Sequence, residues 1–302
     1  MPTRPAVPES MTAESVSKLG LSAASTVVGV IGDPVAHSLS PRLHNVAFAH
    51  LGLDWVSVGF RVVEGDAPAA LIGARSLGIR GLSVTMPHKA DVAEHVDRLT
   101  ELAERVGAVN CVTNVDGILT GDNTDGRGLV EALRRGGHFD PDGRRCVVVG
   151  AGGAARSIIA ALADAGASEV VVVNRTPERA VAAATLAGPV GRVGGPEAVR
   201  GSDLVVNATP TGMAGTPAAP GSAEADRWAL DPARLGPDQL AVDLVYHPAI
   251  TPWLEAARSR GAQVLNGLGM LVHQAALQLE TWTGQEPPVD AMWRAIGEFA
   301  SE

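Results

Sequence analysis

The sequence is short of cysteine and lysine, and it has no long apolar run. Its two cysteines, Cys111 and Cys146, form neither a disulfide framework nor a Cys-x-x-Cys metal site. We expect both to be small buried hydrophobic residues in a reducing compartment. No uninterrupted apolar run reaches the roughly 18 residues that a membrane span requires, so we expect no membrane partner.

Positive charge is also scarce. The chain of 302 residues has 24 basic and 33 acidic residues, a formal net charge of −9. Binding to nucleic acid generally needs a basic surface that displaces counterions, so we expect no nucleic-acid partner. A pocket can still bind a small anionic ligand, because local charge can oppose the charge of the whole protein.

Residues 1–25 are rich in Pro, Ser, Thr and Ala and lack an apolar segment long enough for a signal peptide. We interpret them as a flexible extension and expect a cytoplasmic protein that is a monomer or a homodimer. The rest of the chain is long enough for one large or two modest domains.

After residue 25, short β-branched runs alternate with Ala- and Leu-rich stretches. This pattern is typical of an α/β protein with mostly parallel sheets. The pair Asp116-Gly117 predicts a hairpin between strands at 109–115 and 118–120. The other predicted strands are 27–31, 55–62, 81–85, 146–149, 170–173, 204–207 and 241–244.

A glycine-rich turn follows the strand predicted at 146–149. The run Gly150-Ala151-Gly152-Gly153-Ala154-Ala155 has the form G-x-G-x-x-A and precedes a predicted helix. The first glycine permits a tight turn, the second lets backbone approach a pyrophosphate, and the small last residue lets helix and strand pack closely. The helix N-terminus adds free N–H groups for phosphate oxygens. The turn predicts dinucleotide binding, and a purely structural glycine turn is the alternative.

The end of the next strand distinguishes NADP from NAD. NAD enzymes commonly place an acidic residue there for the ribose hydroxyls, whereas this chain has Asn174-Arg175-Thr176, with Arg179 one helical turn later. Two guanidinium groups attract a 2′-phosphate and can bind it through paired hydrogen bonds. We therefore predict NADP(H) as the cofactor. The alternative is that both arginines are ordinary surface residues.

Lys89 ends a polar run at 83–89 that follows a predicted strand. The chain has only one other lysine, Lys18, which falls in the expected extension. Pro87 forces a turn there, and ligands of α/β proteins bind at the carboxyl ends of parallel strands. Burial can tune a lysine amine to exchange protons, which arginine does not do. A chain that otherwise uses arginine therefore indicates an acid–base role for Lys89.

Further polar clusters stand at predicted element ends. Ser38 and Ser40 suit hydrogen bonds to a carboxylate, although Ser40 could be only a helix N-cap. Asn110 offers an amide at a helix–strand connection. Asp125 could pair with Lys89 and bind a substrate hydroxyl, or could be only an N-cap. The eight histidines form no H-E-x-x-H or comparable pattern, so we expect no metal site.

Taken in order, these motifs resemble those of the shikimate dehydrogenase family over about residues 27–290. The similar segments are 32–41, 84–89, Gly107-Ala108-Val109-Asn110, 121–125, the glycine turn, Asn174-Arg175-Thr176, 207–210, 243–246 and 267–275. The resemblance implies two α/β domains with the active site in the cleft between them. One is a Rossmann-type NADP-binding domain at 126–266. The other is a discontinuous N-terminal substrate and catalytic domain at 26–125 plus 267–302.

The resemblance also implies an activity and individual roles. The activity is the NADP-dependent, reversible reduction of 3-dehydroshikimate to shikimate, a step of chorismate and aromatic amino-acid biosynthesis, with Lys89 as the acid–base residue and Asp125 as its partner. The other implied contacts are Ser38 and Ser40 on the substrate carboxylate, Thr85, Asn110, Asp125 and Gln274 on ring hydroxyls, Tyr246 beside the substrate and nicotinamide, and Leu244 and Gly267 near the nicotinamide.

Ser83, His88 and Leu39 depart from the family pattern. They leave the reaction class unchanged but keep quinate or aminoshikimate open as the substrate, and His88 could tune Lys89. A second alternative is a non-catalytic NADP(H) or metabolite sensor, against which the intact Lys89 and Asp125 argue. A third, an enzyme like glutamyl-tRNA reductase, would need a nucleophilic cysteine and an RNA-binding surface.

Overall fold

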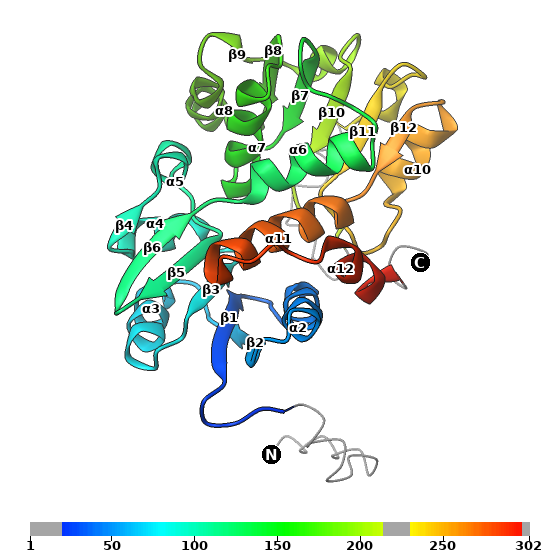
Figure 1. Cartoon of the computed structure of the whole chain (residues 1–302). Helices are drawn as coiled ribbons and strands as arrows, with labels where there is room; N and C mark the ends of the chain where they lie inside the picture. Colours follow the sequence, from blue (N-terminus) through cyan, green and yellow to red (C-terminus); the bar gives the residue numbers. More distant parts are fainter. Residues whose placement is uncertain (1–19, 214–229, 298–302) are drawn as a thin grey trace, which may run out of the picture.

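A computed structural model describes residues 20–213 and 230–297. Within these ranges the chain forms two six-stranded sheets, each flanked by helices (Figure 1). Of the expected extension at 1–25, residues 1–19 lie outside the described residues, and the first strand begins at Thr26. None of the helices in the described ranges is long and apolar enough to cross a membrane.

The first sheet is mixed, with strand order β2-β1-β3-β5-β6-β4. Three of its five strand pairings are parallel, as expected, and β5 runs antiparallel to both β3 and β6. The predicted hairpin is confirmed, with Asp116 and Gly117 at positive φ (51° and 82°) in the turn between β5 and β6. The strands are β1 (Thr26–Gly32), β2 (Trp55–Arg61), β3 (Gly81–Val84), β4 (Arg98–Leu99), β5 (Cys111–Val115) and β6 (Ile118–Asp122).

Helices cover both faces of the first sheet. Val28 of β1 packs in one buried cluster with Leu43 and Trp282, whereas Ile31 packs in another with Leu71. Side chains alternate between faces along a strand, so one buried strand contributes to both clusters. The helices that follow strands of this sheet are α2 (Ser40–His50), α3 (Ala67–Ser76), α4 (Lys89–His95) and α5 (Glu101–Val106).

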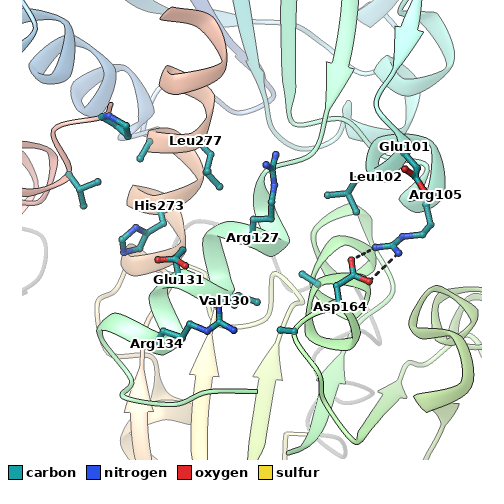
Figure 2. Close-up of a pocket in the computed structure, with 15 residues that line it drawn as sticks. Glu101, Leu102, Arg105, Arg127, Val130, Glu131, Arg134, Asp164, His273 and Leu277 are labelled. Carbon is teal, nitrogen blue, oxygen red and sulfur yellow. Dashed lines mark hydrogen bonds and ion pairs between the residues drawn. The ribbon is translucent and has the colours of Figure 1, made fainter. Parts of the chain in front are cut away.

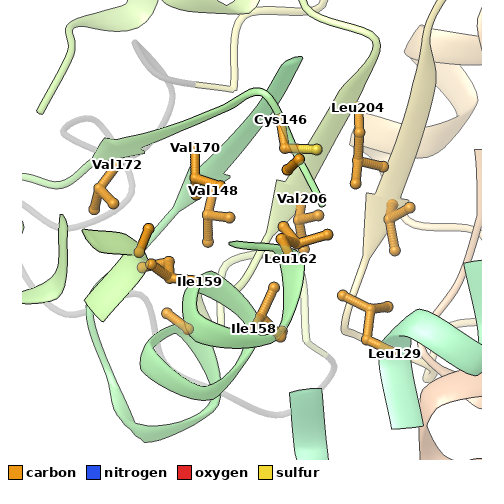
Figure 3. Packing of buried hydrophobic residues seen from close by; sticks show 14 of the residues in the cluster. Leu129, Cys146, Val148, Ile158, Ile159, Leu162, Val170, Val172, Leu204 and Val206 are labelled. Carbon is orange, nitrogen blue, oxygen red and sulfur yellow. The ribbon is translucent and has the colours of Figure 1, made fainter. Parts of the chain in front are cut away.

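The second sheet is entirely parallel, with strand order β12-β11-β10-β7-β8-β9. Its central strands are buried on both faces, which explains their continuous β-branched sequences. Val148 belongs to the cluster in Figure 3, and Val147 to the cluster on the opposite face. The strands are β7 (Arg145–Val149), β8 (Glu169–Val173), β9 (Gly191–Val193), β10 (Leu204–Asn207), β11 (Leu240–Asp243) and β12 (Gln263–Leu265).

The helices around this sheet follow the alternating pattern of the sequence. Helix α7 carries Ile158 and Leu162 into the cluster of Figure 3, and α10 carries Leu254 into the opposite one. The α-helices are α6 (Asp125–Arg135), α7 (Gly153–Asp164), α8 (Pro177–Ala184) and α10 (Pro252–Ser259), and three short 3-10 segments lie at Thr185–Val190, Pro196–Val199 and Pro232–Arg234.

Helices α6 and α11 lie side by side between the two sheets (Figure 1). Helix α11 covers Leu268–Thr283, and α12 (Val289–Ala295) follows it. Gly128 of α6 permits the close approach, because a Cβ there would lie 2.7 Å from the backbone nitrogen of Gln274. This packing brings Gln274 to the first turn of α6, where Asp125 lies.

Candidate active site

Lys89 and Asp125 form a hydrogen-bonded ion pair. Lys89 begins α4 after the turn that ends β3, and Asp125 begins α6. Lys89 Nζ donates to Asp125 Oδ2 at 2.6 Å, and the two side chains are only 15% and 4% exposed. A pair so shielded from water interacts more strongly than a surface pair. The carboxylate therefore fixes the direction of the lysine amine.

The alternative role of Asp125 as a helix cap is wrong. The N-cap of α6 is Thr124, and no side chain caps this end. The second carboxylate oxygen of Asp125 instead accepts a hydrogen bond from Asn110 Nδ2 at 2.8 Å. Both oxygens are thus committed to polar side chains of the first sheet and its connections.

Asn110 is the centre of a buried network. Its amide also donates to Thr124 Oγ1 at 2.9 Å and to Gln274 Oε1 at 3.2 Å, while Asn110 Oδ1 accepts from Thr124 N at 2.8 Å. Asn110 is 1% exposed. Such a fully bonded network holds its members in one arrangement. Four predicted site residues, Lys89, Asn110, Asp125 and Gln274, are therefore brought together.

The serine segment lies where α2 begins. Ser40 is the first residue of that helix and is buried, but the N-cap is Leu39 without a side-chain cap bond, so the alternative that Ser40 is an N-cap is wrong. Ser38 Oγ accepts a hydrogen bond from Ser40 N at 3.3 Å. The segment after β11 meets this loop: burial raises the pKa of Tyr246, and a hydrogen bond from the backbone of Leu39 opposes that rise.

Thr85 lies at the end of β3, beside Gly32 at the end of the neighbouring parallel strand β1. Its methyl group would be 2.4 Å from a Cβ at position 32, so Gly32 leaves room for it. Among the described residues, no hydrogen bond joins the Thr85 hydroxyl to the Lys89 cluster. Thr85 therefore shares the sheet edge with the cluster but stands apart from its network.

The glycine turn has the geometry that a dinucleotide phosphate needs. Gly150 has φ 121°, which other residues rarely adopt, and a Cβ there would lie 3.0 Å from the carbonyl oxygen of Ala208. Gly152 is the N-cap of α7, and a Cβ there would meet nothing within 4 Å. The open backbone at the start of a 12-residue helix is a ready anion site.

The two predicted 2′-phosphate arginines are exposed after β8. Asn174 Nδ2 donates to the carbonyl of Thr176 at 3.0 Å, and Thr176 is the N-cap of α8, whose first turns carry Arg179. Within residues 20–213 and 230–297, neither Arg175 nor Arg179 has a carboxylate within ion-pair distance. Both guanidinium groups are therefore free to bind an anion from outside the chain.

The two halves meet at Leu244 and Gly267. A Cβ at position 267 would lie only 2.0 Å from the Leu244 carbonyl oxygen, so only glycine fits at position 267. Gly267 N also donates to Val245 O at 3.2 Å. This contact closes the end of β11 onto the start of α11, where the resemblance to the family implies the nicotinamide.

Comparison with known proteins decides the family. Residues 30–112 match the shikimate dehydrogenase substrate binding domain, 133–209 match shikimate / quinate 5-dehydrogenase, and 267–296 match the shikimate 5'-dehydrogenase C-terminal domain. A shikimate dehydrogenase (NADP(+)) of Moorella thermoacetica is 43% identical over 91% of this chain and 94% of its own. The chain belongs to the shikimate dehydrogenase family.

Solved structures of the family agree with the fold. Shikimate 5-dehydrogenase of Thermus thermophilus in complex with NADP(H) and shikimate is 37% identical, with a TM-score of 0.80 over 91% of this chain and 99% of that one. Quinate dehydrogenase of Corynebacterium glutamicum in complex with NAD is 30% identical, with a TM-score of 0.79 over 91% and 99% of the two chains. The two α/β domains are thus a family feature.

The departures from the family pattern now have positions. His88 is 1% exposed, and its Nε2 donates a hydrogen bond to the carbonyl oxygen of Val62 at 2.7 Å. The ring therefore anchors the turn before Lys89 to the segment after β2. Ser83 is buried within β3, paired with Cys111 of β5. Both residues are buried in the strand and turn that lead to Lys89.

Two features of the site were missed at the level of sequence. Asn123, fully buried, donates to Ala108 O at 2.9 Å and accepts from Asp125 N at 3.1 Å, so it fixes the chain on either side of the ion pair. Gly153 of the cofactor turn packs on Lys89: a Cβ at 153 would lie 3.3 Å from Lys89 Cβ. Asn123 lies within the segment 121–125 that resembles the family, whereas no local signal indicated the Gly153 contact.

A groove of about 740 Å³ lies elsewhere, between α5, α6, α7 and α11 (Figure 2). Its walls carry Arg105 paired with Asp164, together with Arg127, Arg134 and His273. None of the predicted site residues lines it. The groove is therefore separate from the Lys89 cluster. In the described part of the chain, no group of three or more His, Cys, Asp or Glu could hold a metal ion.

Proposed function

We propose that this protein is an NADP-dependent shikimate dehydrogenase that interconverts 3-dehydroshikimate and shikimate. The observation that carries the proposal is the Lys89–Asp125 pair, bonded at 2.6 Å, shielded from water and packed against the cofactor turn through Gly153. A proton donor held beside a dinucleotide site is what reduction of a ketone requires. The relative from Thermus thermophilus was solved with NADP(H) and shikimate together.

The chain divides between the two sheets. We assign 26–125 plus 267–302 to the substrate and catalytic domain and 126–266 to the NADP-binding domain. The match of 30–112 to a substrate binding domain supports the first assignment. The all-parallel second sheet with its glycine turn supports the second. Residues 214–229 and 298–302 of these ranges lie outside the described residues.

The chain's own residues fit NADP(H). The backbone of Gly150 to Ala154 at the start of α7 would hold the pyrophosphate, and Asn174, Arg175, Thr176 and Arg179 would hold the 2′-phosphate ribose. Leu244 and Gly267 would border the nicotinamide. The bound cofactor supplies or accepts the hydride, and the enzyme's groups manage the accompanying proton and the substrate's orientation.

In the reductive direction the ketone carbon gains the hydride, and its oxygen gains a proton. The Lys89 ammonium, aimed by Asp125, gives that proton as the alkoxide forms, and in the oxidative direction the neutral amine takes it back. Ser38 and Ser40 bind the substrate carboxylate. The ring hydroxyls bond to Thr85, Asn110, Asp125 and Gln274, and Tyr246 lines the substrate side of the cleft.

Quinate is the second candidate substrate. The similarity to the quinate dehydrogenase of Corynebacterium glutamicum favours it, as do the departures at Ser83 and Leu39. Aminoshikimate stays open on the same grounds. A silent NADP(H) sensor is disfavoured, because a sensor has no need of a formed and shielded Lys89–Asp125 pair.

The test is reduction of NADP⁺ or NAD⁺, followed by the absorbance of the reduced nicotinamide, with shikimate and with quinate. A kcat/KM for shikimate and NADP⁺ that exceeds the other three pairs by at least about tenfold, or roughly 1.4 kcal/mol, supports the proposal. A higher kcat/KM for quinate than for shikimate overturns the assignment of shikimate as the substrate. No turnover by folded protein with any pair overturns the activity.

The state of the two cysteines indicates the compartment. Cys111 and Cys146 are free and buried, and burial raises the pKa of both thiols, which makes them poor nucleophiles. Free thiols are expected in the reducing cytoplasm, where we place the protein. A monomer or a homodimer stays our prediction for its assembly.

A further inference from the structure

Asp243 is a buried carboxylate to which the sequence motif gave no role. It is the last residue of β11 and is fully buried. Its Oδ1 accepts hydrogen bonds from Asn207 Nδ2 at 3.0 Å and from Val245 N at 3.1 Å, and its Oδ2 accepts from Thr251 Oγ1 at 2.7 Å. The three donors come from three different segments of the chain.

These segments all lie at the carboxyl edge of the second sheet. Asn207 ends β10 and pairs in register with Asp243. Its Oδ1 accepts from both the backbone nitrogen and the hydroxyl of Thr209. Thr251 is the N-cap of α10 and also accepts from Leu254 N. The carboxylate therefore ties together the loops that leave β10 and β11.

Burying a carboxylate at this position costs free energy, because a charge is removed from water. Within the described residues no lysine or arginine lies within ion-pair distance of Asp243, and burial raises its pKa to about 6 in spite of the three donors. A neutral amide could make the same three contacts without burying a charge. The retained charge holds its donors more firmly, since hydrogen bonds to an ionised acceptor are the stronger ones.

The segment that Asp243 fixes runs from the second sheet to the hydrophobic cluster of the first. Leu244 follows directly, with its carbonyl pressed against Gly267, and Val245 O accepts from Gly267 N. Tyr246 then packs on the hydrophobic cluster of the first sheet, next to Leu39 of the serine loop. A short segment from the second sheet thus delivers the one tyrosine of the chain to the substrate loop of the first.

We propose that Asp243 is a positioning residue that locks the segment after β11 so that Tyr246 lies against the serine loop. It touches neither substrate nor cofactor and acts through Tyr246. The proposal rests on the proposed function for the substrate role of Tyr246 and the two serines, but the position of the Tyr246 ring can be measured without turnover.

The kinetic test is a double-mutant cycle. Asp243→Ala frees the segment and raises the KM for shikimate by about tenfold or more, the scale expected when a binding group is misplaced. Tyr246→Ala has a comparable effect. In the Tyr246→Ala background no ring is left to position, so Asp243→Ala adds less than about twofold. If the increases in KM of the two single variants multiply in the double variant, the proposal is overturned.

Two further variants separate positioning from stability. Asp243→Asn keeps all three contacts, because the Thr251 hydroxyl can accept where it donated, and it holds the KM within about twofold of wild type. Gln239 lies at the other end of the same sheet, just before β11, and its buried amide donates to Val199 O, Ser202 O and Ser202 Oγ. Gln239→Ala lowers the melting temperature but leaves the KM unchanged. An equal rise in KM for this control would show a merely structural role.

The position of the ring is read by NMR of protein labelled with ¹³C-tyrosine. Tyr246 is the only tyrosine, so the ring gives a single set of signals. Asp243→Ala shifts or broadens them, whereas Asp243→Asn and Gln239→Ala leave them in place. Unchanged signals in Asp243→Ala overturn the proposal. Inactive wild-type protein whose signals respond as expected would overturn the proposed function and leave the positioning role standing.

Discussion

Gly153 at the start of α7 packs closely against Lys89 at the start of α4. A Cβ at position 153 would lie 3.3 Å from Lys89 Cβ and 3.4 Å from Lys89 Cδ, tighter than ordinary contacts between such atoms. The glycine turn therefore packs directly on the side chain of Lys89. Under the proposed function, this contact couples the cofactor turn to the proton donor.

Gly153→Ala is expected to lower kcat by about tenfold, the cost of disturbing proton transfer that normally contributes roughly 10²–10⁴. The added methyl group pushes the Lys89 stem and lengthens its bond to Asp125. Gly152→Ala is the matched control, because a Cβ there meets nothing within 4 Å of this chain. It should raise the KM for NADP⁺ and leave kcat alone. Steady-state kinetics with both substrates varied checks this contrast, and equal effects of the two variants on kcat would contradict it.

Lys89→Ala is expected to lower kcat by about 10²–10⁴ with a much smaller rise in the KM for shikimate. The amine acts in the transition state, while the carboxylate and hydroxyl contacts of the substrate persist. A large rise in KM with kcat intact would show that Lys89 only binds substrate. Circular dichroism melting of the variant confirms that the protein remains folded when its ion pair is lost.

Arg175→Ala and Arg179→Ala are each expected to raise the KM for NADP⁺ roughly ten- to a hundredfold, since a hydrogen bond to a charged group contributes about 1.5–3 kcal/mol. The KM for NAD⁺, which lacks the 2′-phosphate, should stay the same. Arg258→Ala on α10 is the control, because its guanidinium pairs with Glu255 on the same helix. Preference for NADP⁺ that survives both substitutions would place the 2′-phosphate elsewhere.

Asp243 should make stability fall as pH rises from about 4 to about 6. Burial raises its pKa to about 6 in the folded protein, whereas the unfolded chain has the ordinary value of about 3.9. Between these values the folded state holds a proton that the unfolded state has released, so unfolding becomes easier with increasing pH. Urea denaturation of wild type and Asp243→Asn at several pH values measures this. The free energy of unfolding of the wild type should fall relative to that of the variant across that window. Above pH 7 the difference between the two should stay constant. A constant difference would contradict the raised pKa.

Much of the fold was already present in local patterns. The Asp116-Gly117 turn, the buried strands and the glycine turn each depend on neighbours within a few residues, where steric limits on φ and ψ decide the outcome. The Asp116-Gly117 turn also indicated that β5 and β6 are antiparallel, but nothing indicated that β5 also pairs antiparallel with β3. A strand's alternation of side chains looks the same whether its neighbour runs parallel or antiparallel.

The sequence by itself determined the residue types of the site: a lone lysine after a strand, a carboxylate, two serines, and arginines where a 2′-phosphate would lie. Only the tertiary structure decided which of them meet. Asn110 is hydrogen-bonded to Gln274, which is 164 positions away in the sequence. Gly153 packs on Lys89, and Asp243 accepts hydrogen bonds from Asn207 and Thr251 and so fixes the segment that carries Tyr246. Such contacts depend on how closely α6, α7 and α11 pack, and that packing is set by the combined fit of many buried side chains from distant segments. No local pattern encodes it.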